Sequence, residues 1–413
     1  MFRTFIHTEL AHYRRLSSAA QRMMRSIAVY EFLYPLLSLF VYAFILRKTS
    51  DFSAVAVYNL GSFLSLPLSF YWNGMLLRRY PVRLPYLAGI VGQGIVACLV
   101  FFFSFETTLS LFFFGILQGI PMGLYWANRN FLSLDLTHDE NRNYFTGIES
   151  MLGTIAGIFT PVLIGWTIVL GEQFQLYSIE SAYKALGLFS LIVLFWGGAQ
   201  IADVEFTQPK LTKLRVQRPS LTWLSARMVE VFRGVQSSVY IFFTPLATFV
   251  FFGQEESLGK LQSVAAVVGA VIIYFLARQL RPAKRLRTLQ YSVVVLVMLS
   301  VLFVVQFSSL TALAYLLFMS TLYKIQWITS NPITMRVIDE EEDGDPTNNY
   351  AYVCDREIYL NVGRVIGVVM FLGVVMWQTQ VIALRLLPIF AALMQIGLAM
   401  YVAKVDKSVA TDR

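Results

Sequence analysis

The stretch Gly74-Met-Leu-Leu-Arg-Arg-Tyr-Pro-Val-Arg83 decides how this sequence is interpreted. It places three arginines and a proline between two apolar segments, at about residues 53–77 and 85–104. Each segment has the roughly 20 mostly apolar residues that a helix needs to cross a bilayer. A short basic loop between two such segments predicts a membrane protein whose chain turns back at residues 78–83.

The composition of the whole chain supports this interpretation. Of its 413 residues 57% are hydrophobic and only 14% are charged, against about 25% charged in soluble domains. These values exclude a disordered chain, and a single soluble globule could not bury so much apolar surface. The excess of 33 Lys and Arg over 25 Asp and Glu indicates basic loops at a membrane surface rather than nucleic-acid binding.

Hydropathy predicts the fold class: an all-α membrane protein with twelve transmembrane helices in two six-helix bundles. The predicted domains are an N-terminal bundle at 1–201, a cytoplasmic central loop at 202–234 and a C-terminal bundle at 235–413. Within the central loop we predict a short amphipathic helix, Trp223 to Arg233, at the membrane surface. The predicted spans lie near 24–47, 53–77, 85–104, 108–132, 144–170, 181–201, 235–253, 257–277, 288–307, 310–335, 351–377 and 381–403.

The positions of the basic residues predict the orientation. Arginines and lysines gather in the loop at 78–83, in the central loop and at 278–287, all on the side of both termini. Because cytoplasmic loops are enriched in such residues, we expect both termini in the cytoplasm and the chain in the cell (inner) membrane. The acidic run at 339–345 lies on the same side, and acidic residues contribute little to orientation. We expect that run to be a solvated loop.

Several residues recur between the two halves at a nearly constant offset. This offset predicts a duplication in which the two bundles are pseudo-symmetric. The recurring pairs are Pro81 and Pro282, Arg83 and Lys284, Trp126 and Trp327, and Asn130 and Asn331 at 201 residues, then Asn143 and Asn349, Glu149 and Asp355, and Gly157 and Gly363 at 206 residues.

Two six-helix halves joined by a basic central loop resemble the major facilitator superfamily of secondary transporters, bacterial members included. The loop after the second span is similar to the superfamily's Gly-x-x-x-Asp-Arg-x-Gly-Arg-Lys, with Gly74, Arg79 and Arg83 at matching positions. Arg78 replaces the usual Asp and Pro81 the usual Gly, so this loop lacks the acidic residue of the superfamily's usual charge relay. The resemblance implies that helices 1, 4, 7 and 10 line a central cavity between two rocking halves. It also implies a gating role for Gly74, Arg79 and Arg83.

Charged side chains within spans are costly, so they are expected to face a cavity or a partner. Glu31 is a candidate for proton coupling because a carboxyl group in an apolar helix is readily kept neutral, with Glu149 as the second candidate. The alternative for either residue is a permanent ion pair with Arg129. Asp355 and Glu357, near the interface, are predicted to belong to a gate or a surface salt-bridge cluster.

Candidate substrate-binding residues are cationic, aromatic or amide side chains in the same helices. Residues three and four apart share a helix face, and a rise of about 1.5 Å per residue places Lys324 and Arg364 deep in the membrane. Each could instead neutralise a carboxylate of the other half. The candidates are Arg129, Lys324, Arg364, Tyr30, Tyr34, Tyr125, Trp126, Asn130, Trp327, Asn331 and Asn361.

The deep charges lean cationic, which suits an anionic or zwitterionic solute held by charge-assisted hydrogen bonds. The predicted function is a secondary active transporter for a small polar solute of this kind, coupled to protons and working by alternating access as a monomer in the lipid bilayer. No enzyme, cofactor or metal motif is found. The alternatives are a multidrug efflux antiporter, suggested by Gly153, Gly157, Pro161 and Gly165 in the fifth span, a flippase for lipid-linked headgroups, and a receptor of the same fold that has lost transport. Close helix packing explains the same glycines equally well.

Overall fold

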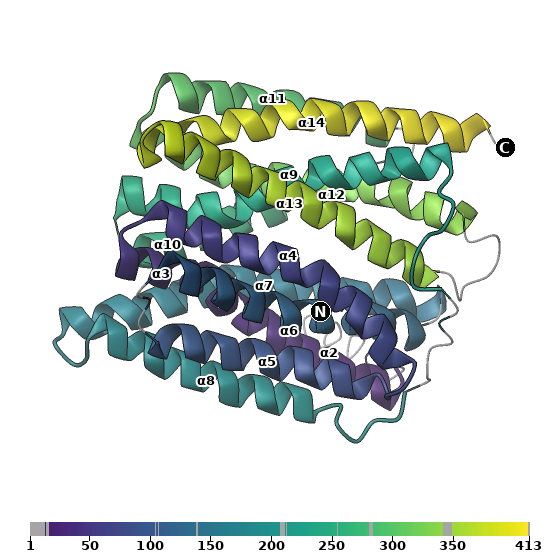
Figure 1. Cartoon of the computed structure of the whole chain (residues 1–413), viewed down its shortest axis with the longest axis horizontal. Coiled ribbons are helices and arrows are strands. Elements are labelled where there is room, and N and C mark those ends of the chain that lie inside the picture. Colours follow the sequence, from purple (N-terminus) through teal and green to yellow (C-terminus); the bar gives the residue numbers. More distant parts are fainter. Residues whose placement is uncertain are drawn as a thin grey trace, which may run out of the picture.

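The computed structural model describes residues 13, 16–103, 105, 107–137, 139–206, 211, 213–253, 255–280, 284–341 and 349–411. In this part of the chain every regular element is a helix. The helices lie side by side along one direction, and most of the second half lies above the first in Figure 1. The end of the molecule at which α4 gives way to Arg78 and Arg79, and at which α8 is joined to α9, is called the basic end below. Most of the acidic run, residues 342–345, lies outside the described residues.

The first half contains six spans. The first is a single rod built from three segments, because a π-helical turn interrupts it. The elements are α2 (Ser18–Pro35), η1 (Leu36–Phe40) and α3 (Val41–Thr49) in the first span, followed by α4 (Phe52–Leu77), α5 (Arg83–Phe102), α6 (Thr108–Asp135), α7 (Asp139–Gln173) and α8 (Ile179–Ala199).

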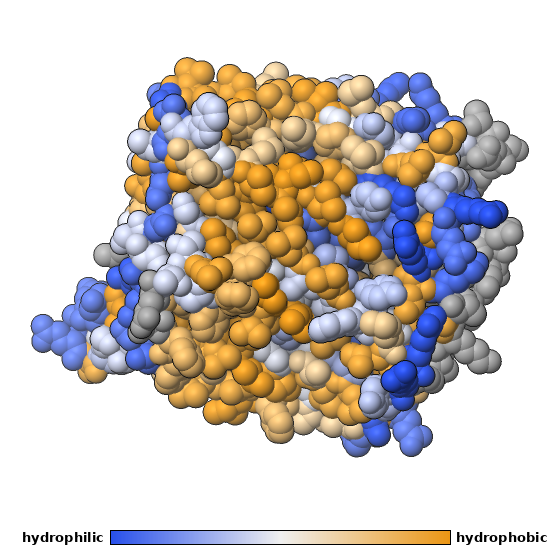
Figure 2. All heavy atoms as spheres, in the orientation of Figure 1, coloured by the Kyte–Doolittle hydropathy of each residue, from blue (hydrophilic) through white to orange (hydrophobic). Residues whose placement is uncertain are grey.

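The second half repeats this number of spans, so the twelve predicted spans are confirmed as helices. Its elements are α9 (Leu221–Phe252), α10 (Glu255–Gln279), α11 (Arg285–Val305), α12 (Ser309–Glu341), α13 (Asn349–Trp377) and α14 (Gln380–Thr411). Among the described residues eleven spans are long and apolar enough to cross a membrane by length and composition. The remaining helix, α12, carries Lys324, Gln326 and Asn331. Figure 2 shows the result, an apolar band between two polar ends.

The predicted amphipathic helix at 223–233 is not a separate surface element. Ser220 caps α9 by accepting a hydrogen bond from the Trp223 amide, and the helix then continues to Phe252. Trp223 and Arg233 are only 2% and 3% exposed. The predicted boundary at 234/235 therefore falls inside a helix. The helix continues through Gly234, where the backbones of α9 and α13 are in close contact. A Cβ at this position would lie 2.0 Å from the Leu360 carbonyl oxygen of α13.

Glycines bring several helices into backbone contact. A Cβ added to Gly363 of α13 would lie 1.9 Å from the Val231 carbonyl oxygen of α9, and one on Gly115 of α6 would lie 2.0 Å from the Tyr58 carbonyl oxygen of α4. In lipid, helices associate through such close packing, because the hydrophobic effect does not drive them together. The α9–α13 and α4–α6 pairs thus form the rigid centre of each half.

The alanine variant of Gly363 tests this packing. We expect Gly363→Ala to reduce the free energy of unfolding by about 1–3 kcal/mol, because the new methyl group must push α13 away from α9. SDS titration in mixed micelles would measure this change. Gly373→Ala is the matched control on the same helix, since a Cβ there meets no described atom within 4 Å. Equal stabilities for the two variants would contradict a packing role for Gly363.

Among the described residues the two halves meet chiefly where α4 packs on α13 and α7 on α10, and α9 also contacts the first span and α4. Each pair joins one helix of the first half to one of the second. The inner surfaces of these helices, together with α12, therefore enclose the space between the halves, where the candidate site lies.

Candidate substrate site

A cavity of about 920 Å³ lies between the two halves. Its walls come from the first span and α7 in the first half and from α9, α10 and α12 in the second. Pockets for small molecules usually measure 300–1,000 Å³, so this one can hold a solute together with water. Ionisable side chains reach it from both halves: Glu31 from α2 and Lys324 from α12.

Glu31 lies on α2, one turn before Pro35 and the π-helical turn at Leu36–Phe40. Its carboxylate points at α7, where a Cβ on Gly153 would lie 3.2 Å from Oε2. Among the described residues no cation lies within ion-pairing distance of it. The predicted Arg129 pair is therefore not formed, and the carboxylate faces the cavity.

Lys324 lies on α12 and its side chain is exposed to the cavity. Its Nζ lies 4.0 Å from where a Cβ on Gly269 of α10 would be. In the described part of the chain it has no carboxylate partner. The prediction that it neutralises a carboxylate of the other half is thus not met in this conformation. An ammonium group without a partner inside a membrane is costly unless water or a ligand solvates it.

Aromatic and hydroxyl groups complete the walls. Tyr34 and Trp327, both predicted, line the cavity. Tyr240 and Tyr323, which were not among the candidate site residues, also line it and stack on each other with ring centroids 5.3 Å apart and planes 9° from parallel. Small polar side chains at Ser38, Ser150, Thr154, Thr244, Gln262 and Ser320 add hydrogen-bonding groups.

The predicted site residues of α6 lie outside the cavity. Arg129 forms an ion pair with Glu149 of α7 and donates a hydrogen bond of 2.9 Å to Asn130 Oδ1. Its guanidinium also lies 5.1 Å from the Trp126 ring centroid. This is the structural pairing that was the alternative for Glu149, and it leaves that carboxylate outside the cavity.

Tyr30 and Tyr125 also belong to the packed core of the first half. Their rings stack with centroids 3.8 Å apart, and both residues are fully buried. Tyr30 donates a hydrogen bond of 3.0 Å to Gln93 Oε1. Tyr30 lies one turn from Tyr34 on the same face of α2, but the cavity ends between the two.

Arg364 of α13 points between the halves without lining the cavity. It donates hydrogen bonds to Ser237 Oγ at 3.3 Å and to Asn361 Oδ1 at 3.1 Å, and its guanidinium lies 5.4 Å from the Phe63 ring centroid. These partners are neutral. Asn361, the other predicted residue on this helix, is only 1% exposed and holds Arg364 in place.

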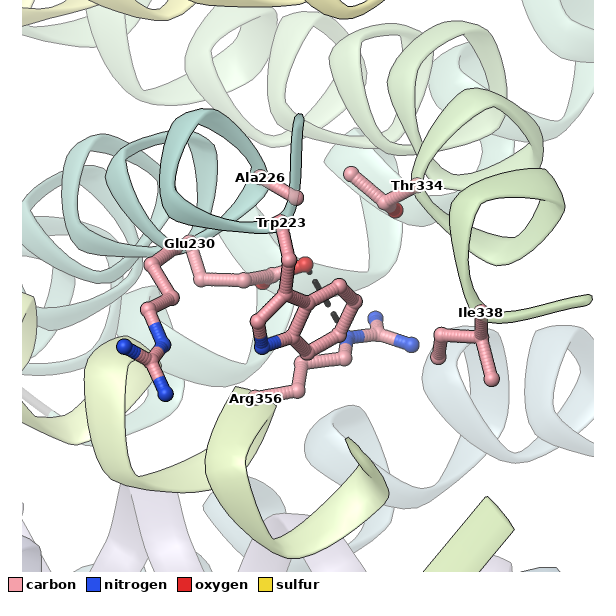
Figure 3. A pocket seen from close by; sticks show the side chains of 7 residues that line it. Trp223, Ala226, Glu230, Thr334, Ile338 and Arg356 are labelled. Carbon is pink, nitrogen blue, oxygen red and sulfur yellow. Dashed lines mark ion pairs between the residues drawn. The ribbon is translucent and has the colours of Figure 1, made fainter. Parts of the chain in front are cut away.

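A buried ion cluster joins α9, α12 and α13 near the basic end. Arg233 donates hydrogen bonds of 2.6 and 2.7 Å to the Glu230 carboxylate, and Arg356 Nε lies 3.0 Å from Glu230 Oε1. Figure 3 shows the Glu230–Arg356 ion pair beside Thr334 and Ile338 of α12. Arg356 also donates a hydrogen bond of 2.7 Å to Asn331 Oδ1. Asn331 therefore holds the cluster together and does not reach the cavity.

Asp355 anchors the start of α9 to α13. Arg227 binds its carboxylate through two hydrogen bonds of 2.6 and 2.8 Å, and Trp223 Nε1 donates a third at 2.8 Å. Trp327 links the buried ion cluster to the cavity, because the guanidinium carbons of Arg233 and Arg356 lie 4.8 and 5.3 Å from its ring centroid. The Trp327 side chain thus contacts both the cavity and the buried ion cluster that joins α9, α12 and α13.

Comparison with known proteins agrees with this architecture. The profile of the Major Facilitator Superfamily matches residues 19–348. The chain belongs to this superfamily. An uncharacterised protein of Bacillus subtilis, YqgE, is 25% identical over 368 residues, which are 87% of this chain and 82% of that protein.

Two solved transporters of the superfamily share the fold. A bacterial homologue of the human lysosomal transporter Spinster, in an inward-facing and unoccupied conformation, has a TM-score of 0.64 and 13% identity over 97% of this chain and 98% of its own. A mutant of the nucleoside transporter NupG has the same TM-score and identity over 94% of this chain and 98% of its own. Family and fold together are those of a multi-pass membrane transporter rather than an enzyme.

The superfamily loop after the second span lies against the other half. A Cβ on Gly74 would lie 2.7 Å from the Tyr350 ring of α13, which explains the glycine. Asn73 donates a hydrogen bond of 2.9 Å to the Tyr350 hydroxyl. Arg79 is exposed and Arg83 half-buried. The predicted gating role of these residues stays a prediction, and so does that of Glu357, which lies on α13 between Arg356 and Arg364.

The opposite end is closed by polar contacts between the halves. Arg47 of α3 binds Glu255 of α10 through hydrogen bonds of 2.6 and 2.5 Å, and Tyr183 of α8 adds a third at 3.3 Å. Gln380, at the start of α14, donates a hydrogen bond of 2.7 Å to the Asp51 carboxylate. None of these residues was a candidate in the sequence analysis. Contacts between helices that lie far apart in the sequence leave no local sequence pattern that could predict them.

Proposed function

We propose that this protein is a proton-coupled secondary transporter of a zwitterionic solute that works by alternating access. The observation that carries the proposal is a pair of ionisable groups in one cavity, a carboxylate on the first half and an ammonium on the second, neither of which has an ion-pair partner among the described residues. Glu31 suits the cationic group of a solute and Lys324 its anionic group. A solute bound to both bridges the two halves, so its binding and release are linked to their relative movement.

The same proposal indicates to which side of the membrane the cavity is closed in this conformation. With the basic end in the cytoplasm, the Arg47–Glu255 and Asp51–Gln380 contacts close the external side. The rocking of the two halves must break them to admit or release the solute outside. Glu31 is the proposed proton site, because it lines the cavity and is free of the ion pair that occupies Glu149. A single polypeptide forms the whole cavity, which supports a working monomer.

Neutralising Lys324 tests the proposed solute charge. We expect Lys324→Gln to raise the Kd of a zwitterionic solute tenfold or more, because a hydrogen bond to a charged group contributes about 1.5–3 kcal/mol. Binding is measured as thermal stabilisation of the purified protein against amino acids, betaines, phosphoethanolamine, organic anions and lipophilic cations. Lys184→Gln is the matched control, since Lys184 pairs with Glu180 outside the cavity. Stabilisation by lipophilic cations alone would overturn the proposal and favour drug efflux.

A further inference from the structure

The seam between α7 and α10 opens progressively towards the basic end. A Cβ on Gly165 of α7 would lie 2.7 Å from the Glu255 carbonyl oxygen, and one on Gly259 of α10 would lie 2.3 Å from the Pro161 carbonyl oxygen. Further along, a Cβ on Gly157 has only one described neighbour within 4 Å, the Ala266 Cβ at 3.8 Å. At Gly153 the described atoms within 4 Å are those of Glu31 alone. The two helices are therefore in backbone contact near Gly165 and Gly259 and are separated from each other towards the basic end.

The cavity extends into the region where the two helices are separated. Met151 of α7 and Tyr274 of α10 line the cavity and are each 54% exposed. The next residues outward on α10, Val271 and Phe275, are 51% and 59% exposed. Met151 lies seven residues from the end of the apolar span Tyr144–Gln173, about 10 Å inside it at 1.5 Å per residue. Tyr274 lies two residues from the end of the apolar span Glu255–Leu276, so the opening lies at the edge of the apolar phase of the bilayer.

Apolar side chains form most of the cavity wall along α7 and α10. Ile155 on α7 and Ala266, Ala270 and Ile273 on α10 line the cavity there, together with the polar side chains of Ser150, Thr154 and Gln262. The charged groups lie at the inner end of this wall, where Glu31 stands beside Gly153 and Lys324 Nζ beside Gly269. The two charges thus flank the inner mouth of the seam, one next to each of the helices that form it.

We infer that the transported zwitterion carries a single alkyl chain, with its headgroup between Glu31 and Lys324 and its chain leaving through the α7–α10 opening into the bilayer. This inference rests on the proposed function and narrows its substrate class to single-chain zwitterionic amphiphiles. The chain contacts a mostly apolar wall and then lipid, so little polar surface loses its hydration along this path. Only the headgroup needs the hydrated, charged cavity to pass the bilayer core.

A photolabelled amphiphile tests the position of the chain. The probe is a monoacyl glycerophosphoethanolamine with a diazirine on the last acyl carbon, added to the full-length protein in phosphatidylglycerol nanodiscs. We expect labelling of the peptides that contain Met151 and Tyr274. Lys324→Gln should lower this labelling about tenfold, because the phosphate loses its charged donor. Labelling spread evenly over lipid-facing residues such as Trp196, or unchanged in the variant, would overturn the inference.

A pair of tryptophan variants tests the opening itself. Ala270→Trp should close the passage and reduce labelling at Met151 to the level of Lys324→Gln, whereas Val264→Trp adds the same bulk on the lipid-facing side of α10 and should leave labelling unchanged. Val264 is 50% exposed and lies outside the cavity.

Chain-free glycerophosphoethanolamine separates the inference from the proposed function. If this headgroup stabilises the protein but the acyl probe labels at random, the transported zwitterion has no chain and the proposed function stands. If neither compound binds in a manner that depends on Lys324, both fail.

Discussion

Glu31→Gln is expected to abolish coupling, whereas exchange of the solute persists at a raised solute concentration. In vesicles with the membrane potential clamped at zero and a gradient of one pH unit, one proton coupled per solute supports a steady-state solute ratio of about 10, since 1.4 kcal/mol corresponds to a factor of ten. The glutamine side chain has nearly the same shape but cannot lose a proton. The variant should therefore reach a ratio of 1, because nothing links the solute to the pH gradient.

Counterflow exchange provides the internal control for this result. Exchange of labelled for unlabelled solute needs the binding site and the movement of the two halves, but no net proton transfer. We expect Glu31→Gln to retain exchange when the solute concentration is raised tenfold or more, which offsets the lost charged partner of the solute's cationic group and shows that the variant is folded and inserted. If Glu31→Gln still concentrates solute and Glu149→Gln does not, the proton is carried by the carboxylate that pairs with Arg129, and our assignment is wrong.

The sequence predicted the helices well because a bilayer imposes a length on each of them. A span needs about 20 apolar residues, so its ends are marked by polar or helix-ending residues such as those at 78–83. The one substantial error, the surface helix at 223–233, arose where polar residues belong to a spanning helix. Glu230 and Arg233 of this helix are buried although both are charged. They neutralise each other one turn apart, and this spacing was the signal that could have corrected the assignment.

The cavity was predicted only in part, because depth in the membrane does not specify the direction in which a side chain points. Glu31 and Lys324 were found because unpaired charges in spans are costly. The same reasoning selected Arg129 and Arg364, and it cannot tell a cavity from a partner on a neighbouring helix. Tyr240 and Tyr323 were missed for the converse reason. Tyrosine is common in spans, and only the packing of α9 against α12 makes these two a stacked pair.

The cores of the two halves are stabilised by different interactions. In the first half Tyr30 and Tyr125 stack beside Trp126, where one cation, Arg129, pairs with one carboxylate, whereas in the second half Arg233 and Arg356 share one carboxylate near Trp327. An aromatic core tolerates small changes, since dispersion contacts are many and individually weak. A cluster with two cations and one anion depends on a single residue.

Glu230→Gln is therefore expected to be the most destabilising single change in the second half. Its side chain is 3% exposed and contacts both Arg233 and Arg356. Removing one partner of a buried ion pair costs about 3–5 kcal/mol, because the remaining charge stays buried without compensation. Here two guanidinium groups lose their carboxylate at once. SDS titration in mixed micelles should report a fall in the free energy of unfolding within or above this range.

Glu180→Gln is the matched control, because Glu180 also contacts two cations, Lys48 and Lys184, but with 45% of its side chain exposed. Water solvates all three groups there, so the loss should stay below about 1 kcal/mol. The comparison separates the effect of burial from the effect of the number of ion pairs. Equal losses in the two variants would mean that Glu230 is hydrated in the folded protein, and the buried cluster would then not be what fixes α9 against α13 at the basic end.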